Sequence, residues 1–408
     1  MNTSIITGRL PSRSETFVST HAGGFARRGC DVAVLSQGQG LGIHLDEVDE
    51  IDALGLRRVR VRNLGGSQLP RVVRMLWIGL QHPWMFRWWR SRIPWTRREL
   101  FEAWNYARCL PSGRSALVHV HYGAKAGPMQ AIGALPECAV ITWHGYDANE
   151  KPRQRGGAMY HELFKAGHLH TVGSSFMRQR LVELGAREDS ISVIPMGIDL
   201  DRFHPPRLPR SYSGGLRIIS VGRLHEMKGH RFLIAAVGEL QRQGLDLRLR
   251  IVGEGPERRA LEQQIEELGL SKSVELVGAL GSDEILCELH QADLFALTGV
   301  VADSGRVETQ GVVFAEAQAT GLPVIACDVG GVSESLIDGE TGILCPPGDV
   351  AAITRAIRHF IEAPEDLKRY GDAGRRFVEE RFSLTKMLDS FEALYRKVGE
   401  LNQNAPSC

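Results

Sequence analysis

Short apolar runs alternate with amphipathic stretches along the whole chain, and this alternation limits the possible folds most strongly. The runs are rich in valine and isoleucine and are mostly bounded by glycine or proline, as is typical of parallel strands buried on both faces. Between them, apolar residues recur at helical spacing, as at Leu261, Ile265 and Leu268. Alternating strands and helices predict a doubly wound α/β fold. The expected strands are Asp31–Ser36, Leu117–Tyr122, Ala139–Trp143, Ile191–Pro195, Leu216–Val221, Leu247–Val252, Val274–Val277, Asp293–Leu297 and Pro323–Ala326.

The length of 408 residues predicts two domains, because a single core rarely grows so large. Phe203–Gly215 contains three prolines, two serines and two glycines and is followed at once by a new strand, which marks a linker. We therefore expect Rossmann-like domains over 1–205 and 216–380, a linker over 206–215 and a helical tail over 381–408. Two such domains facing one another leave a cleft beyond the carboxyl ends of their strands, where ligands of open parallel sheets bind.

Composition excludes several classes of protein. The 49 basic and 48 acidic side chains nearly cancel, so no overall charge points to nucleic acid. The seven cysteines are odd in number and never spaced C-x-x-C, so we expect neither a disulfide framework nor a zinc site. No signal peptide and no apolar run of about 18 residues is found. We therefore expect a cytoplasmic protein.

Two glycine-containing turns follow strands in the second half. At the first, Gly222 ends a strand and Arg223 and Lys228 follow, which could hold a diphosphate between a planar fork of donors and a point charge. Two surface cations near a turn is an equally good interpretation. At the second, IVGEGPE, Arg258 stands where a third glycine would complete G-x-G-x-x-G. This departure argues against an NAD-dependent oxidoreductase, and the glycines are better explained by close backbone approach.

Glu308 and Glu316 form the most informative pair of acids. They are eight residues apart, with Gly311 between them. If a helix begins near Gly311, Glu308 lies in the loop before it and Glu316 about one turn in. Carboxylates accept two hydrogen bonds from vicinal hydroxyls, while helix N-terminal N–H groups favour phosphate. The competing interpretation, two solvated acids, fits poorly with the apolar and glycine-rich surroundings.

The chain from about 215 to 350 resembles the nucleotide-binding domain of glycosyltransferase family 4, which has the GT-B fold. The motifs that carry the resemblance are VGRL…KG, ADLFAL, ETQGVVFAE, EAQATGLPVIA and DGETGILCPPGD. The first half resembles the acceptor side of the family in RLPSRSETFV, GCDVAVLS, VHVHYG, TWHGYD, VGSS and VIPMGIDLDRFHP, and particularly transferases of exopolysaccharide and colanic acid assembly. The resemblance implies that the helical tail crosses back to the first domain.

The resemblance also implies roles for residues that bind the donor. Arg223 and Lys228 would clamp the diphosphate and stabilise the leaving nucleotide, next to Gly222. Glu308 would bind donor-sugar hydroxyls with the backbone of Gln310 and Gly311, and Glu316 would hold the ribose diol. In the first half, Ser14, Glu15 and Thr16 would face the phosphates, and His144 and Asp147 would lie near the transferred sugar or the acceptor. The family is usually retaining and metal-independent, so no cofactor is expected.

Two further patterns resemble functional sites but can also be explained as structural features. Asp199-Leu200-Asp201 spells D-x-D, the metal–diphosphate motif of a different transferase fold, and we interpret it as structural. His119 and His121 lie on one strand, and we expect them to point to opposite faces. On this expectation His119 is a core histidine and His121, at the strand end, is the cleft residue.

The segment 53–98 is strongly basic, with eleven arginines and no Asp, Glu or Lys, and five of the seven tryptophans fall within 71–95. Arginine with interfacial tryptophan is typical of a monotopic membrane contact. Inward-packed tryptophans with solvated arginines are an equally good interpretation, and a single-stranded nucleic acid groove is a weaker one. We expect 71–98 to approach an anionic membrane that carries the acceptor.

The sequence therefore predicts a retaining glycosyltransferase that moves a sugar from a UDP- or GDP-sugar to a lipid-linked glycan in cell-surface polysaccharide assembly. It would act in the cytoplasm, peripheral on the inner face of the membrane. Two alternatives stay open, a UDP-sugar epimerase of the same fold and a non-catalytic nucleotide-binding scaffold.

Overall fold

The computed structural model describes residues 2–7, 16–37, 56–61, 94–110, 117–207 and 215–403. The chain divides into two compact units. Unit 1 comprises Met1–Val172, Arg178–Ile194 and Leu388–Cys408, and unit 2 comprises Gly173–Met177 and Pro195–Met387. Most of the C-terminal helix therefore belongs with the first unit. Among the helices of the described ranges, none combines the length and the hydropathy that crossing a bilayer requires.

Unit 1 is built on a parallel sheet of seven strands in the order β3-β2-β1-β4-β5-β6-β7. Its central strands are buried along their whole length, including the two histidines of Leu117–His121, as is typical of parallel strands covered on both faces. The strands are β1 (Asn2–Ile6), β2 (Asp31–Ser36), β3 (Arg57–Arg60), β4 (Leu117–His121), β5 (Val140–Trp143), β6 (Leu169–Val172) and β7 (Ile191–Val193).

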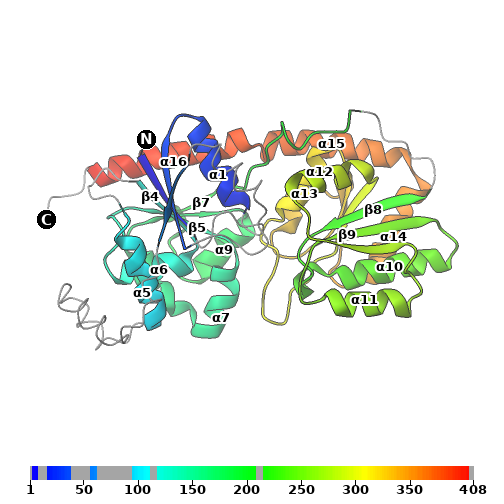
Figure 1. The fold of residues 1–408 in the computed structure, drawn as a ribbon, viewed down its shortest axis with the longest axis horizontal. Coiled ribbons are helices and arrows are strands. Elements are labelled where there is room, and N and C mark those ends of the chain that lie inside the picture. The colour runs from blue at the N-terminus through cyan, green and yellow to red at the C-terminus, as the bar shows by residue number, and fades with distance from the viewer. Residues whose placement is uncertain are drawn as a thin grey trace. The chain divides into compact units, whose positions relative to one another are not determined.

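Helices cover both faces of this sheet, with α1 and α16 on one side and α5 and α6 on the other (Figure 1). The end of α16 is tied to the unit by Asn402, whose buried amide exchanges two hydrogen bonds with the backbone of Cys138, of 2.9 and 3.0 Å. The principal helices are α1 (Thr16–Arg27), α5 (Arg97–Ala107), α6 (Gly123–Ala131), α7 (Lys151–Arg155), α8 (His161–Lys165), α9 (Ser175–Glu183) and α16 (Leu384–Gln403); shorter turns are η2 (Tyr146–Glu150), η3 (Gly157–Tyr160) and η4 (Glu188–Ser190).

Unit 2 has a parallel sheet of six strands in the order β10-β9-β8-β11-β12-β13. One buried core lies between this sheet and α10, α11 and α14, and a second lies on the side of α12 and α13 (Figure 1). The strands are β8 (Leu216–Val221), β9 (Leu247–Val252), β10 (Val274–Gly278), β11 (Leu294–Leu297), β12 (Val324–Cys327) and β13 (Gly342–Cys345). The helices are α10 (His230–Arg242), α11 (Arg258–Glu267), α12 (Ser282–Gln291), α13 (Val312–Ala319), α14 (Val350–Glu362) and α15 (Glu365–Arg381), with short turns η5 (Glu226–Lys228) and η6 (Val332–Ser335).

These units confirm the α/β prediction of two doubly wound, Rossmann-like domains. Every expected strand is present, with bounds that differ by at most two residues. Four strands lie outside those runs: β1, β3, β6 and β13. Of these, β3 and β13 are edge strands, where arginine or glycine is tolerated because one side has no partner strand. The strand β6 is short and its histidine interrupts the apolar pattern.

The strand order reverses direction between β1 and β4 in unit 1 and between β8 and β11 in unit 2. In open parallel sheets, ligands bind beyond the carboxyl ends of the strands at such a switch point. The residues that follow β4, β5, β8 and β11 are therefore the candidates for a functional site.

Candidate functional site

Glycines shape the turn that follows β8. A Cβ on Gly253 would lie 2.0 Å from the carbonyl oxygen of Gly222, and one on Gly255 would lie 2.2 Å from that of Leu224. The IVGEGPE glycines therefore let the loop after β9 approach the loop after β8 closely, as predicted. Arg223, at the tip of the β8 turn, is exposed, and no described side chain pairs with its guanidinium.

Lys228 is held in place by the residue after it. Gly229 has φ +64°, and a Cβ there would lie 1.9 Å from the carbonyl oxygen of Thr298, so only glycine fits. From this turn the Lys228 ammonium reaches the Glu308 carboxylate, with 2.5 Å between Nζ and Oε2. Both side chains are mostly buried, exposed by 13% and 16%. The structure thus pairs two of the predicted donor-site residues directly.

The charge of Glu308 is stabilised by this pairing. Burial by itself raises the pKa of the Glu308 carboxyl, but the charge and hydrogen bond of Lys228, with the Thr309 N–H, more than offset it. The net pKa lies below the ordinary value. Glu308 is therefore ionised near neutral pH, as an acceptor of sugar hydroxyls must be.

A pair of glycines after β12 holds the loop that carries Glu308. A Cβ on Gly330 would lie 2.0 Å from the carbonyl oxygen of Glu308, and one on Gly331 would lie 2.0 Å from that of Thr309. The Gly331 N–H donates to the Glu308 carbonyl oxygen at 3.0 Å. Side chains at both positions would push this loop away, so the two glycines fix the backbone on which the carboxylate is mounted.

Gln310 and Gly311 complete that loop. The Gln310 side chain is buried, accepting from the Met196 N–H at 2.9 Å and donating to the Met196 carbonyl oxygen at 3.1 Å. Its amide thus holds the loop in place. Gly311 has φ +76° and caps α13, so this helix begins where the sequence predicts, with Glu308 in the loop before it.

Glu316 lies one turn into α13 and is half-buried. Burial raises the pKa of its carboxyl to about 7, and the charge of Arg202 offsets this only in part. No described group donates a hydrogen bond to the carboxylate. A desolvated acceptor of this kind is suited to hydroxyl donors from a ligand.

The corresponding edge of unit 1 is formed where β4 and β5 end. Tyr122, directly after β4, has φ +80° and is the one described non-glycine residue with a positive φ. Such strain is typical of functional turns. The next residue must be glycine, because a Cβ on Gly123 would lie 2.2 Å from the Trp143 ring. After β5, the His144 ring lies against Phe17 and Tyr122, with ring centroids 4.4 and 4.7 Å apart.

Asp147 is fully buried, and backbone donors occupy its carboxylate. Oδ2 accepts from the Gly123 N–H at 2.7 Å, and Oδ1 accepts from those of His144 and Gly145, each at 3.1 Å. Burial raises the pKa of Asp147 to about 6 despite these bonds. The carboxylate joins the turns after β4 and β5, so in this unit it positions His144.

The prediction that His119 and His121 point to opposite faces is wrong. Residues two apart on a strand project to the same face, and the two rings are stacked with centroids 4.5 Å apart and planes at 19°. Both are fully buried. His121 therefore reaches a ligand only through His144, whose Nε2 lies 2.9 Å from His121 Nδ1.

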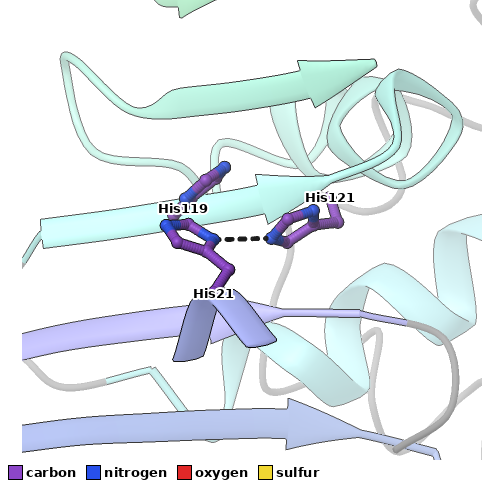
Figure 2. Close-up of side chains that lie close together, drawn as sticks. All are labelled: His21, His119 and His121. Carbon is purple, nitrogen blue, oxygen red and sulfur yellow. Dashed lines mark hydrogen bonds between the residues drawn. The ribbon is translucent and has the colours of Figure 1, made fainter. Parts of the chain in front are cut away.

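His21 from α1 joins these two residues in a cluster (Figure 2). One nitrogen from each of His21, His119 and His121 lies within 4.8 Å of the others, so within the described ranges this group could hold a metal ion. Burial lowers the pKa of His21 to about 3 and those of His119 and His121 well below the ordinary value, so all three are neutral. Metal-independence stays a prediction.

Three sets of candidates remain: residues 14–16, the D-x-D motif and the basic segment. Ser14 and Glu15 lie outside the described residues, as does 71–93 of the basic segment, while Thr16 begins α1. In the D-x-D motif, Asp199 Oδ1 accepts from the backbone N–H groups of Asp201 and Arg202, which agrees with a structural role. Trp95 is buried against Gly127 and Tyr160, as the packing interpretation of the basic segment requires for this residue.

Fold and site geometry together define the GT-B class, and solved structures support it. The chain superimposes on a glycosyltransferase from Rickettsia africae with a TM-score of 0.73 and 20% identity, covering 97% of this chain and 98% of that one. It also superimposes on Anabaena HepE in complex with UDP-glucose, with a TM-score of 0.71 and 18% identity, covering 97% and 100%.

Sequence comparison places the chain in a family. The model of glycosyl transferases group 1 matches residues 208–377, and that of Glycosyltransferase Family 4 matches residues 14–202. A GDP-mannose-dependent alpha-(1-6)-phosphatidylinositol monomannoside mannosyltransferase of Mycolicibacterium smegmatis is 30% identical over 65% of this chain and 73% of its own length. WcaL of Escherichia coli, named for colanic acid biosynthesis, is 32% identical over 60% of each chain. The chain belongs to the group 1 and family 4 glycosyltransferases, and its match spans 60% of the length of WcaL.

The Lys228–Glu308 pair predicts a specific pH dependence of stability. Because the folded-state pKa of Glu308 is lowered, its contribution is present above the unfolded pKa of about 4.3 and is lost as pH falls through the folded value. The free energy of unfolding should therefore fall less steeply in Glu308→Gln than in the wild type as the pH is lowered from about 6 to about 3, as measured by urea denaturation. The exposed Glu340→Gln is the matched control. An unchanged slope for Glu308→Gln would contradict the pairing.

Proposed function

We propose that this protein is a retaining glycosyltransferase that moves a sugar from a UDP- or GDP-sugar to a lipid-linked glycan in cell-surface polysaccharide assembly. The observation that carries the proposal is the mostly buried Lys228–Glu308 pair at the carboxyl edge of the unit 2 sheet, together with the exposed Arg223, whose guanidinium pairs with no side chain of the described residues. Family membership supports the same reaction class.

The two cations fit a diphosphate in complementary ways. A lysine ammonium has three N–H donors. Glu308 uses one of them, which leaves Lys228 free to bind a phosphate oxygen without breaking the pair. Arg223 would add a planar fork of donors from the exposed tip of the β8 turn. Together they would stabilise the charge that develops on the departing nucleotide, a contribution that needs no bound metal.

The two glutamates would accept hydrogen bonds from the hydroxyl groups of the donor. Glu308, ionised and fixed by its glycine-held loop, would accept from the sugar. Glu316, which no described donor satisfies, would accept from the ribose diol. His144 would face the transferred sugar or the acceptor from unit 1, held there by Asp147.

The identity of the base stays between uracil and guanine. HepE is named in complex with UDP-glucose, and the mycobacterial relative is named as GDP-mannose-dependent. Relatives named for colanic acid and amylovoran biosynthesis support a polysaccharide product. Release of a free epimerised sugar without any acceptor would instead favour the epimerase.

We expect Lys228→Ala to reduce sugar transfer by about 10²–10³, the usual cost of removing one preorganised donor from developing charge. The exposed Lys272→Ala, also in unit 2, controls for the loss of a positive charge. Transfer from a radiolabelled nucleotide-sugar to a membrane lipid extract measures both variants. Wild-type turnover by folded Lys228→Ala would refute the role of this lysine.

The proposal includes contact between 71–98 and an anionic membrane, for which the sequence composition is the support. Each basic residue near such a surface contributes about 1 kcal/mol. Neutralising Arg87, Arg90 and Arg92 should therefore release the protein from phosphatidylserine liposomes at low salt, as measured by sedimentation. Equal binding by the wild type and the triple variant would contradict this contact.

A further inference from the structure

The histidine cluster of unit 1 is part of an unbroken chain of side-chain hydrogen bonds. It begins on β6, crosses to β5 and β4, passes through α16 and α1, and ends at the half-buried His144. In the order of the hydrogen bonds, the residues are Thr171, Thr142, His119, Tyr395, His21, His121 and His144. We call this series the relay.

Strand register brings the first part together. Thr142 on β5 is paired with Thr171 on β6 and with His121 on β4, so these residues form one row across the sheet. Thr171 Oγ1 lies 2.5 Å from Thr142 Oγ1, which lies 2.6 Å from His119 Nε2. His119 Nδ1 then lies 2.6 Å from the hydroxyl of Tyr395.

The second part leads outward. The Tyr395 hydroxyl lies 3.2 Å from His21 Nε2, and His21 Nδ1 lies 3.4 Å from His121 Nε2, the bond dashed in Figure 2. His121 Nδ1 lies 2.9 Å from His144 Nε2. No described group lies within hydrogen-bonding distance of His144 Nδ1, so this atom ends the chain.

Proton counting makes the chain directional. A neutral imidazole has one N–H and one bare nitrogen, and a hydroxyl has a single proton to donate. Burial lowers the pKa of His144 to about 3, so the four imidazoles are all neutral. An imidazole passes the direction of the bonds on unchanged, and so does a hydroxyl that donates its own proton. Two arrangements run in one direction throughout, one pointing from Thr171 to His144 and one pointing back. Any other arrangement changes direction at Thr142 or Tyr395, whose hydroxyl then accepts two bonds and leaves its own proton without an acceptor.

The buried end decides between them. Thr171 is fully buried, and Thr142 is the single described partner of its hydroxyl. In the inward arrangement, Thr142 donates to Thr171, whose own proton then has no acceptor. In the outward arrangement, which points from Thr171 to His144, Thr171 donates to Thr142 and no hydroxyl proton is left without an acceptor. An unsatisfied buried donor costs free energy, whereas a hydroxyl oxygen whose lone pairs are unused is tolerated better.

We propose that this relay fixes His144 as the tautomer with its proton on Nδ1, so that His144 presents a hydrogen-bond donor to the ligand. His121, His21, Tyr395 and His119 are positioning residues that act through His144. The oxygen that receives this bond is a sugar hydroxyl or a phosphate oxygen. The identity of this oxygen rests on the proposed transferase function, whereas the tautomer of His144 does not.

The direct test is ¹⁵N NMR of the histidine-labelled full-length protein, in which protonated and bare ring nitrogens are well separated. His144 should show a protonated Nδ1 and a bare Nε2 in the wild type. A protonated Nε2, or an average of the two tautomers, would overturn the proposal. This readout needs no substrate, so it distinguishes a failure of the relay from a failure of the proposed function.

Breaking the chain tests its role. Tyr395→Phe keeps the ring that packs on Phe25 and Phe391 but removes the hydroxyl. Without the hydroxyl, His21 is no longer connected to His119 and Thr171, which set the direction of the bonds, so we expect His144 to populate both tautomers. An unchanged His144 would overturn the relay as the cause. Should Tyr395→Phe not fold, Thr142→Val interrupts the hydrogen bonds two residues further in, beyond His119.

Two substitutions of His144 connect the tautomer to transfer. An asparagine amide can place an N–H near the position of Nδ1, while a glutamine amide reaches the position of Nε2. His144→Asn should therefore retain about threefold to tenfold more activity than His144→Gln, the value of one hydrogen bond. The opposite order would overturn the proposal.

A metal ion is the competing occupant of the cluster. Neutral imidazoles are good zinc ligands, and a metal bound by His21, His119 and His121 would replace the hydrogen bonds of the relay. Elemental analysis of the purified protein should find less than stoichiometric zinc before and after EDTA treatment. One zinc per chain that is lost on substituting His119 would overturn the relay.

Discussion

The geometry of the parallel sheet determines where every candidate residue lies. Strands that run the same way end at the same edge, and both sheets change winding direction at their centre, between β1 and β4 and between β8 and β11. Loops diverge at such a point and leave room for a ligand. Arg223 and Lys228 follow β8, Glu308 follows β11, and His144 follows β5. Residues far apart in the sequence thus reach the carboxyl edge of their own sheet, Arg223, Lys228 and Glu308 in unit 2 and His144 in unit 1.

Close backbone contact then gives these loops their precision. In unit 2, glycines at 229, 330 and 331 stand where a Cβ would lie about 2 Å from a carbonyl oxygen. They bring the Lys228 turn and the Glu308 loop close enough for a mostly buried ion pair. In unit 1, the Asp147 carboxylate performs the equivalent task with three backbone donors. Both halves use buried structure to hold a small number of polar groups at the sheet edge.

Local patterns in the sequence predicted much of this arrangement, and non-local contacts account for the rest. Apolar runs identified nine of the thirteen strands that the structure describes, and Gly311 identified the start of α13, because these depend on neighbouring residues. The edge strand β3 has exposed arginines and lacks the expected pattern. The relay was not predicted, since Tyr395 approaches His21 only through the packing of α16. The spacing of His119 and His121 did contain the signal, because residues two apart on a strand share a face.

The binding of nucleotides tests the central claim most directly. Thermal unfolding of the full-length protein would be followed with UDP, GDP and NAD⁺, each with Mg²⁺ and with EDTA. A ligand at about 100 times its Kd adds roughly 2.7 kcal/mol to the free energy of unfolding. We predict that one of the two nucleoside diphosphates stabilises the protein equally with Mg²⁺ and with EDTA. No response to either nucleotide, or a response to NAD⁺ alone, would contradict a donor site built on Arg223, Lys228 and Glu308.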